Sequence, residues 1–337
     1  MKFSDIKLNK QFSQYRGLGR FNECFYCKCK SNIVSAHSIS EARCLSLLSE
    51  DFNGQKGVYA FNNIHIEGKE WFIPKEEYYF CLTGISQAST FRGFCEKHDR
   101  EIFKLIDTKS FDSNSMEQCF LYCYRAFAYG YHRKRENIKS SNKFSAYKEH
   151  NPFFIEQFGK NCQLAVDLDC KDLADSLPKW LREKKYGKLY HLYFKTKSSV
   201  PIASANVIQP TYDINGETFN NWENEGIPLS HIFINIIPEL NCTHILISCL
   251  KQDKKSVEYL EKIKALLGID NDWIGKYLTM LLVYFTDNTY IKPSYISRNN
   301  LVKQKILYRL VKTGSIDEAD YFINNPQCDI NLFEESL

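Results

Sequence analysis

Two short pairs of cysteine and histidine residues stand far apart in this chain. Cys24 and Cys27 form a C-x-x-C spacing, and Cys95 and His98 form a C-x-x-H spacing. Thiolate and imidazole are ligands that zinc prefers, and a structural zinc site takes four of them in a tetrahedron. One pair in a tight turn and one in the first turn of a helix is a common source of such a set. The spacing predicts one structural zinc ion bound by these four residues.

The same cysteines have a simpler interpretation as buried free thiols. Cysteine is among the most buried residue types, and chance C-x-x-C pairs are not rare in a chain with 13 cysteines. Cys29 is out of register with Cys27 and is not expected to be a ligand. The order of knuckle, strand, histidine, further strands and a helix that begins with C-x-x-H favours the zinc site.

A histidine and an aspartate beside these pairs are candidates for catalysis. His37 follows a predicted strand through Ile33 and Val34, and Asp99 directly follows His98 at a predicted helix start. An imidazole can deprotonate water, and a carboxylate can hold a divalent cation. Each also has a structural interpretation: His37 as a buried histidine bonded to backbone, and Asp99 as a helix-start acid that the dipole favours.

In this order the residues resemble the HNH, or ββα-metal, group of treble-clef proteins over about residues 20–107. The resemblance implies that His37 is the general base and that Asp99 binds a catalytic Mg²⁺ or Mn²⁺ in an endonuclease. Two positions depart from the group. Ala36 stands where an aspartate or histidine usually precedes the base, and the middle asparagine position falls near Ser89 or Thr90.

The composition indicates an intracellular globular protein. With 337 residues and a hydrophobic fraction of 44%, the chain is long enough for two or three domains. It has no apolar run of about 18 residues for a membrane span and no apolar signal core at the N-terminus. The 13 scattered cysteines indicate reduced thiols, so we expect a cytoplasmic protein that does not contact membranes. A net charge of +4 permits a local nucleic-acid-binding patch without requiring one.

The expected fold class is α+β, in three regions. Residues 1–110 form the zinc-stapled treble-clef unit, 111–190 a helical middle with an amphipathic helix over 115–140, and 191–337 a separate α/β domain of unknown role. Strands are predicted within 191–250, where His231 and His244 lie on apolar strands and are expected to be core histidines with satisfied hydrogen bonds.

Basic residues interleaved with tyrosines lie in the 125–139 part of the predicted helix. They are Arg125, Arg133, Lys134 and Arg135. Such side chains can bind a phosphate backbone and stack bases of DNA or RNA. The alternative is a solvated helix end whose cations complement the helix dipole. A second basic stretch over 179–188 has the same two interpretations.

Two functions remain after these observations. The first is an HNH-like nucleic-acid-binding protein that cuts with a divalent metal, in the bacterial-defence setting that the resemblance implies. The second is a catalytically inactive, zinc-scaffolded module that recognises a protein partner or a small signal through the C-terminal domain. Ala36 discriminates between them, because an active protein should recruit another acid or histidine near His37, whereas a scaffold need not.

Overall fold

The chain folds as a mixed α/β protein made of two compact units. The computed structural model describes residues 19–30, 32–61, 80–144, 152–224, 226–312, 330–333 and 337. The first unit comprises Met1–Ala36, Phe91–Ile102 and Ala128–Glu183, and the second comprises His37–Thr90, Phe103–Phe127 and Lys184–Leu337. Each unit therefore joins segments that are distant in the sequence.

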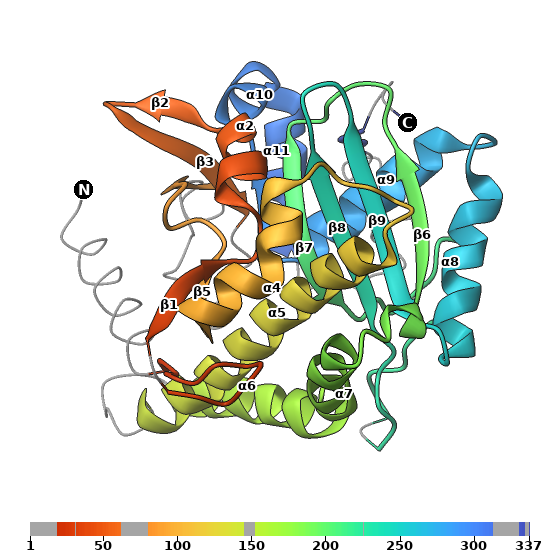
Figure 1. Cartoon of the computed structure of the whole chain (residues 1–337). Helices are drawn as coiled ribbons and strands as arrows, with labels where there is room; N and C mark the ends of the chain where they lie inside the picture. The colour runs from red at the N-terminus through yellow and green to blue at the C-terminus, as the bar shows by residue number, and fades with distance from the viewer. Residues whose placement is uncertain are drawn as a thin grey trace. The chain divides into compact units, whose positions relative to one another are not determined.

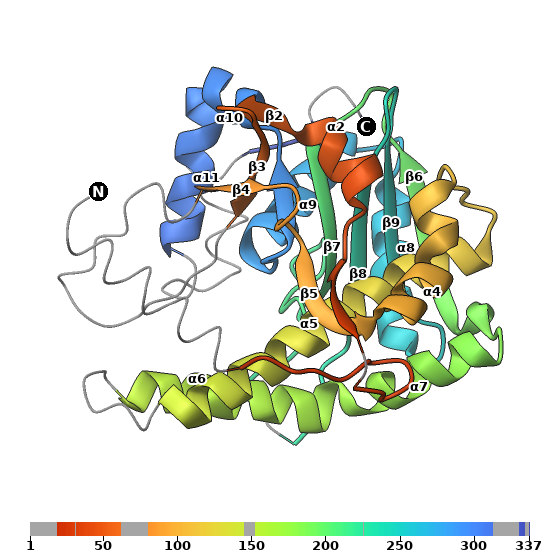
Figure 2. The same ribbon diagram turned by 60° about the vertical axis from the view of Figure 1, so that its left-hand side comes forward.

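The first unit combines a small sheet with helices. Strand β1 (Ile33–His37) pairs with β5 (Thr90–Cys95), and α4 (Glu96–Thr108) follows β5 without a loop. Its other helical elements are the second part of α5 (Met116–Phe144), α6 (Pro152–Leu164), the π-turn η2 (Ala165–Asp169) and α7 (Lys171–Arg182). Aromatic edge contacts of Phe91 with Phe94, Tyr129 and His132 form its core. The loop before β1 runs beside α6 and α7 (Figure 2).

The second unit is built on one large antiparallel sheet. Its strand order is β2-β3-β10-β7-β8-β9-β6, with β4 paired to β3. The strands are β2 (Glu50–Phe52), β3 (Gln55–Phe61), β4 (Phe80–Gly84), β6 (Leu189–Lys195), β7 (Ile202–Ile208), β8 (Ile232–Pro238), β9 (Thr243–Leu250) and β10 (Thr289–Ile291). The helical elements are η1 (Glu41–Leu45), α2 (Ser46–Leu48), η3 (Tyr186–Lys188), α8 (Lys254–Leu266), α9 (Asn271–Tyr284), α10 (Pro293–Arg298) and α11 (Asn300–Lys312).

The central strands β8 and β9 are buried on both faces, which explains why they read as nearly continuous apolar runs. One face, carrying Ile232, Ile234 and Ile236, packs in a single core with residues of α8 and α9. Figure 1 shows these helices on one side of the sheet and the first part of α5 on the other. On that second side, Cys123 of α5 lies close to Ser248 of β9.

The predicted domain boundaries near residues 110 and 190 do not delimit the compact units. Strand β3, from the predicted zinc domain, pairs with β10 near the other end of the chain, with Ala60 opposite Tyr290. Hydrogen bonding along this edge joins strands β2, β3 and β4 to the predicted C-terminal sheet. Among the described helices, none has the length and apolar character that a bilayer crossing requires.

Candidate metal centre

The four predicted zinc ligands lie together in the first unit. One ligand atom from each of Cys24, Cys27, Cys95 and His98 lies within 4.8 Å of the others. His98 Nδ1 is 3.1 Å from Cys95 Sγ and 3.6 Å from Cys24 Sγ. Ordinary Zn–S and Zn–N bond lengths at a tetrahedral angle place sulfur and nitrogen about 3.5 Å apart. The cluster therefore has the composition and the size to hold a metal ion such as zinc.

The knuckle is a tight turn fastened to strand β5. Its ends are closed by bonds from Cys24 N to Cys29 O and from Lys28 N to Cys24 O, each 2.8 Å long. Lys28 has a φ of +60°, the left-handed conformation that reverses the chain. Phe25 N donates to Gly93 O over 2.7 Å. A Cβ on Gly93 would lie 2.3 Å from the ring of Phe91 in the same strand, so glycine leaves room for that ring.

Neighbouring side chains orient the second pair of ligands. Glu96 N, at the start of α4, donates to Asn32 O over 3.0 Å, which fixes the helix start beside β1. The ring of Tyr26 packs against that of His98 with centroids 4.7 Å apart. Arg182 of α7 lies over Tyr26, 5.5 Å from its ring centroid, and donates to Tyr26 O. The knuckle is thus supported from β5, α4 and α7.

The Cys27 and Cys95 thiols carry protons that a bound metal ion would displace. Desolvation raises the pKa of the Cys27 and Cys95 thiols, and hydrogen bonds with the neighbouring thiols of Cys29 and Cys24 raise them further. Desolvation lowers the pKa of His98. Cys29, set aside on its spacing, therefore lies at the edge of this cluster.

His37 lies at the end of β1, and its ring contacts are within the second unit. Its Nε2 is 3.2 Å from Ile85 O and 3.3 Å from Glu41 Oε2. A carbonyl oxygen only accepts hydrogen bonds, so Nε2 carries the proton and Nδ1 is the basic nitrogen. The spacing of His37 and Glu41 gave no signal for this contact, because the four-residue rule applies within a helix and His37 ends a strand.

Asp99 occupies the first turn of α4 and is half-buried. It belongs to the first unit, whereas His37 belongs to the second. The catalytic roles of both residues remain predictions.

Arg125 is not available for phosphate binding, contrary to expectation. It is 3% exposed and forms a two-pronged ion pair with Asp107, with N–O distances of 2.7 and 3.2 Å. Its guanidinium also lies 4.4 Å from the centroid of the Phe103 ring. The amphipathic pattern that gave the helix also placed this arginine on its buried face, where a carboxylate compensates the charge.

The other three basic residues lie inside α5, which continues to Phe144, and not at a helix end. Arg133 pairs with Glu136 at 3.2 Å, and Arg135 lies 4.4 Å from the Phe21 ring centroid and 3.9 Å from a Glu23 oxygen. Burial raises the pKa of the Cys162 and Cys170 thiols, and the nearby charge of Lys134 opposes that rise. All three therefore take part in interactions inside the first unit.

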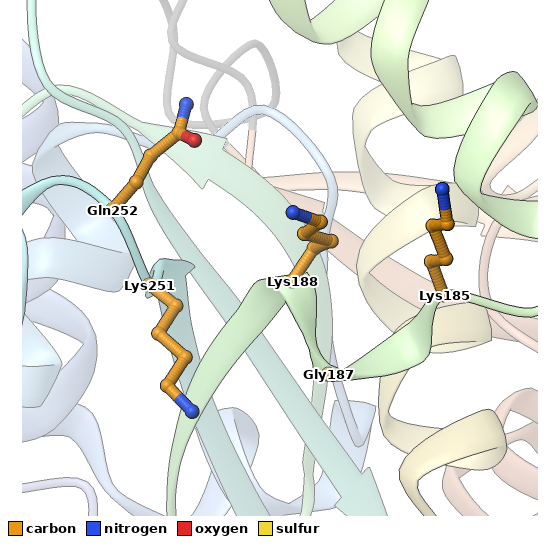
Figure 3. Close-up of a pocket in the computed structure, with 5 residues that line it drawn as sticks. All are labelled: Lys185, Gly187, Lys188, Lys251 and Gln252. Carbon is orange, nitrogen blue, oxygen red and sulfur yellow. The ribbon is translucent and has the colours of Figure 1, made fainter.

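The second basic stretch borders a shallow depression in the second unit. A hollow of about 430 Å³ is lined by Lys185, Gly187, Lys188, Lys251 and Gln252. Figure 3 shows Lys185 and Lys188 extending to the same side and Lys251 extending the opposite way. The three ammonium groups are exposed and spread a positive field without converging on one point.

Comparison with protein-family models, curated proteins and solved structures finds no match to this chain. Its function must therefore be argued from the residues and contacts described above.

Proposed function

We propose that this chain is a zinc-stapled, HNH-like nucleic-acid-binding protein that cuts its substrate with a divalent metal. The observation that carries the proposal is the convergence of Cys24, Cys27, Cys95 and His98 on one metal-sized cluster. The knuckle, paired strands β1 and β5, and helix α4 come in the order expected from the treble-clef resemblance. Zinc would have a structural role, because all four of its positions would be taken by protein ligands.

His37 is the proposed general base. Its Nδ1 would accept a proton from the water that attacks phosphorus, and the imidazolium that forms would face the Glu41 carboxylate. Because Ala36 stands where the HNH group usually has an aspartate or histidine, an active protein should have another acid near His37. Glu41 is such an acid. This contact supports the catalytic function over the inactive scaffold.

Asp99 is the proposed anchor of a catalytic Mg²⁺ or Mn²⁺. Such an ion supplies positive charge to the scissile phosphate and to the leaving oxygen. One carboxylate is a small ligand set, but Mg²⁺ keeps several waters and takes oxygens from substrate phosphates. A half-buried acid at a helix start suits this role.

The proposed phosphate-contacting surface is the lysine-lined depression of Lys185, Lys188 and Lys251. Their exposure and shared sign suit the non-specific attraction of a phosphate backbone. The arginines of α5 are weaker candidates, because phosphate binding there would replace existing contacts with Glu136 and Glu23.

A nuclease assay on full-length protein with Mg²⁺, Mn²⁺ or Ni²⁺ tests the proposal on both DNA and RNA. We expect metal-dependent cleavage that His37→Ala and Asp99→Asn abolish while zinc remains bound. Glu101→Gln, an exposed acid on the same helix as Asp99, serves as the matched control and should keep activity. Absence of cleavage with every ion, together with no gain from Ala36→Asp, would favour the inactive binding module.

A further inference from the structure

A second set of metal-binding side chains gathers at the turn between β8 and β9 in the second unit. Glu239, Cys242 and His244 each offer one ligand atom, and these three atoms lie within 4.8 Å of one another. A bond of 2.8 Å from Glu239 N to Cys242 O closes the turn. All three residues thus come from one short hairpin whose backbone is fixed.

Two of the three distances between these atoms match those around a tetrahedral zinc ion, and the third is within 4.8 Å. Cys242 Sγ is 3.6 Å from His244 Nε2, which in turn is 3.4 Å from Glu239 Oε2. Ordinary zinc bond lengths at a tetrahedral angle give about 3.5 Å between sulfur and nitrogen and about 3.4 Å between nitrogen and oxygen. An ion would fit among the three atoms without movement of the hairpin.

The second nitrogen of His244 and the second oxygen of Glu239 are hydrogen-bonded to neighbouring groups. His244 Nε2 and Glu239 Oε2 are therefore the atoms that face the site. His244 Nδ1 is 3.0 Å from the Tyr193 hydroxyl. Glu239 Oε1 accepts from Arg43 at 2.6 Å and from Phe111 N at 3.1 Å. Metal-binding histidines usually donate their other ring N–H to such a partner, and ligating carboxylates are themselves hydrogen-bonded.

Aromatic rings enclose the imidazole, while the turn itself meets solvent. The ring centroids of Phe111 and Tyr193 are 5.1 and 5.9 Å from that of His244, which is 8% exposed. Leu240 in the turn is 80% exposed, and Cys242 is half-buried. His244 is thus the satisfied core histidine that the sequence predicted, and the polar contacts of its two nitrogens include Tyr193, Glu239 and Cys242.

We propose that Glu239, Cys242 and His244 form a second metal site, for a divalent ion of the zinc class. Thiolate, imidazole and carboxylate together suit zinc better than magnesium or calcium, which prefer oxygen ligands alone. Three protein ligands leave the fourth position to water, unlike the four-ligand cluster of the first unit. This site does not depend on the proposed nuclease function.

The competing explanation is an ion-pair network in which Glu239 ties Arg43 and His244 to the hairpin. The Cys242 thiol and the Tyr193 hydroxyl are not part of such a network. A metal site needs the thiol as a ligand and uses the hydroxyl to orient the imidazole. Substitutions at these two residues therefore separate the explanations while leaving the Arg43–Glu239 pair intact.

Equilibrium dialysis of full-length protein against buffered Zn²⁺ tests the site. We expect two zinc equivalents for the wild type and one for Cys242→Ser and for His244→Gln. Cys81→Ser, a half-buried cysteine in the same unit, is the matched control and should bind two. Tyr193→Phe should bind two, with the affinity of the second about 10- to 100-fold weaker.

Two results would overturn the proposal. One is a single zinc equivalent in the wild type that Cys242→Ser leaves unchanged. The other is two equivalents that persist in both Cys242→Ser and His244→Gln. Cys242→Ser changes one atom at a partly exposed turn, so the fold should survive. Co²⁺ in place of Zn²⁺ gives an independent readout, because the thiolate charge-transfer absorption of the second equivalent should appear in the wild type and in Cys81→Ser and be absent from Cys242→Ser and His244→Gln.

Discussion

His37 and Glu41 are joined by a 3.3 Å contact between Nε2 and Oε2, where β1 gives way to the π-turn η1. The chain around this pair is held by buried polar bonds. Ser38 N donates to Ser89 O over 2.8 Å, and Asn288 Nδ2 donates to Ser38 Oγ over 2.7 Å. The imidazole is therefore attached to a rigid strand end of the second unit, which is how a catalytic group keeps its orientation.

Replacing the carboxylate beside His37 should slow the proposed cleavage without altering the fold. Glu41→Gln removes the negative charge that would stabilise the imidazolium, so we expect a loss of about 10-fold or more in rate. His37→Ala should lose about 100-fold or more, the usual contribution of a general base. Single-turnover cleavage assays measure both. Equal rates for Glu41→Gln and for the control Glu50→Gln would show that the acid has no part in the chemistry.

Substitutions of neighbouring cysteines at the first metal centre should differ in their effect on zinc binding. Cys95→Ala should lose one zinc equivalent and much of the first unit's stability, because metal-binding energy in such a site is folding energy. Cys29→Ala should keep both, although its thiol lies beside those of Cys27 and Cys95. Elemental analysis and thermal unfolding measure the two effects. Zinc loss from Cys29→Ala would instead make Cys29 a ligand.

Metal uptake at this centre should release protons. Because desolvation raises the pKa of Cys27 and Cys95, both thiols are protonated at neutral pH before zinc binds as it does to thiolate. His98, whose pKa is lowered, has no proton to release there. We expect at least two protons per zinc at pH 7, and tighter binding as the pH rises. Calorimetry in buffers of different ionisation enthalpy counts them, and release of fewer than one proton would contradict this account.

Local chemistry could be predicted from the sequence much better than long-range pairing. The spacing of Cys24 with Cys27 and of Cys95 with His98 is a short-range signal, and so are the apolar runs of β8 and β9. The pairing of β3 with β10 joins residues about 230 positions apart, and no local pattern specifies it. The separation of the two units therefore appeared only in the structure.

Charged residues show a similar limit. A basic side chain on an amphipathic helix can face solvent or an acid, and sequence spacing does not decide between them. Arg125 faces Asp107, which is on the preceding helix α4. The Glu239 site was missed for the same reason. Its ligands are oriented by Arg43, Phe111 and Tyr193, which come from three other segments of the chain.

Substituting the buried Arg125 should affect stability, whereas substituting the exposed Lys188 should affect nucleic-acid binding. Arg125→Ala leaves the partly exposed Asp107 without its partner, which should cost on the order of 2 kcal/mol of unfolding free energy. Lys188→Glu should leave stability unchanged and flatten the salt dependence of DNA binding by about 0.9 in log–log slope. Urea unfolding and binding titrations at several salt concentrations test this pair. An unchanged slope in Lys188→Glu would exclude that lysine from the phosphate-contacting surface.

His191 should make the second unit sensitive to acid. Burial lowers the pKa of His191 from 6.5 to about 4, while its Nδ1 lies 2.8 Å from Ser248 Oγ on the neighbouring strand β9. The unfolded chain binds a proton at this residue near pH 6.5 and the folded chain only near pH 4, so stability falls as the pH drops through that window. The full effect is about 3 kcal/mol.

His191→Gln keeps a hydrogen-bonding group but does not titrate, so its unfolding free energy should fall less between pH 7 and pH 4.5. Urea unfolding at matched pH values measures the difference, and equal losses in the wild type and the variant would show that His191 is already accessible to protons in the folded protein.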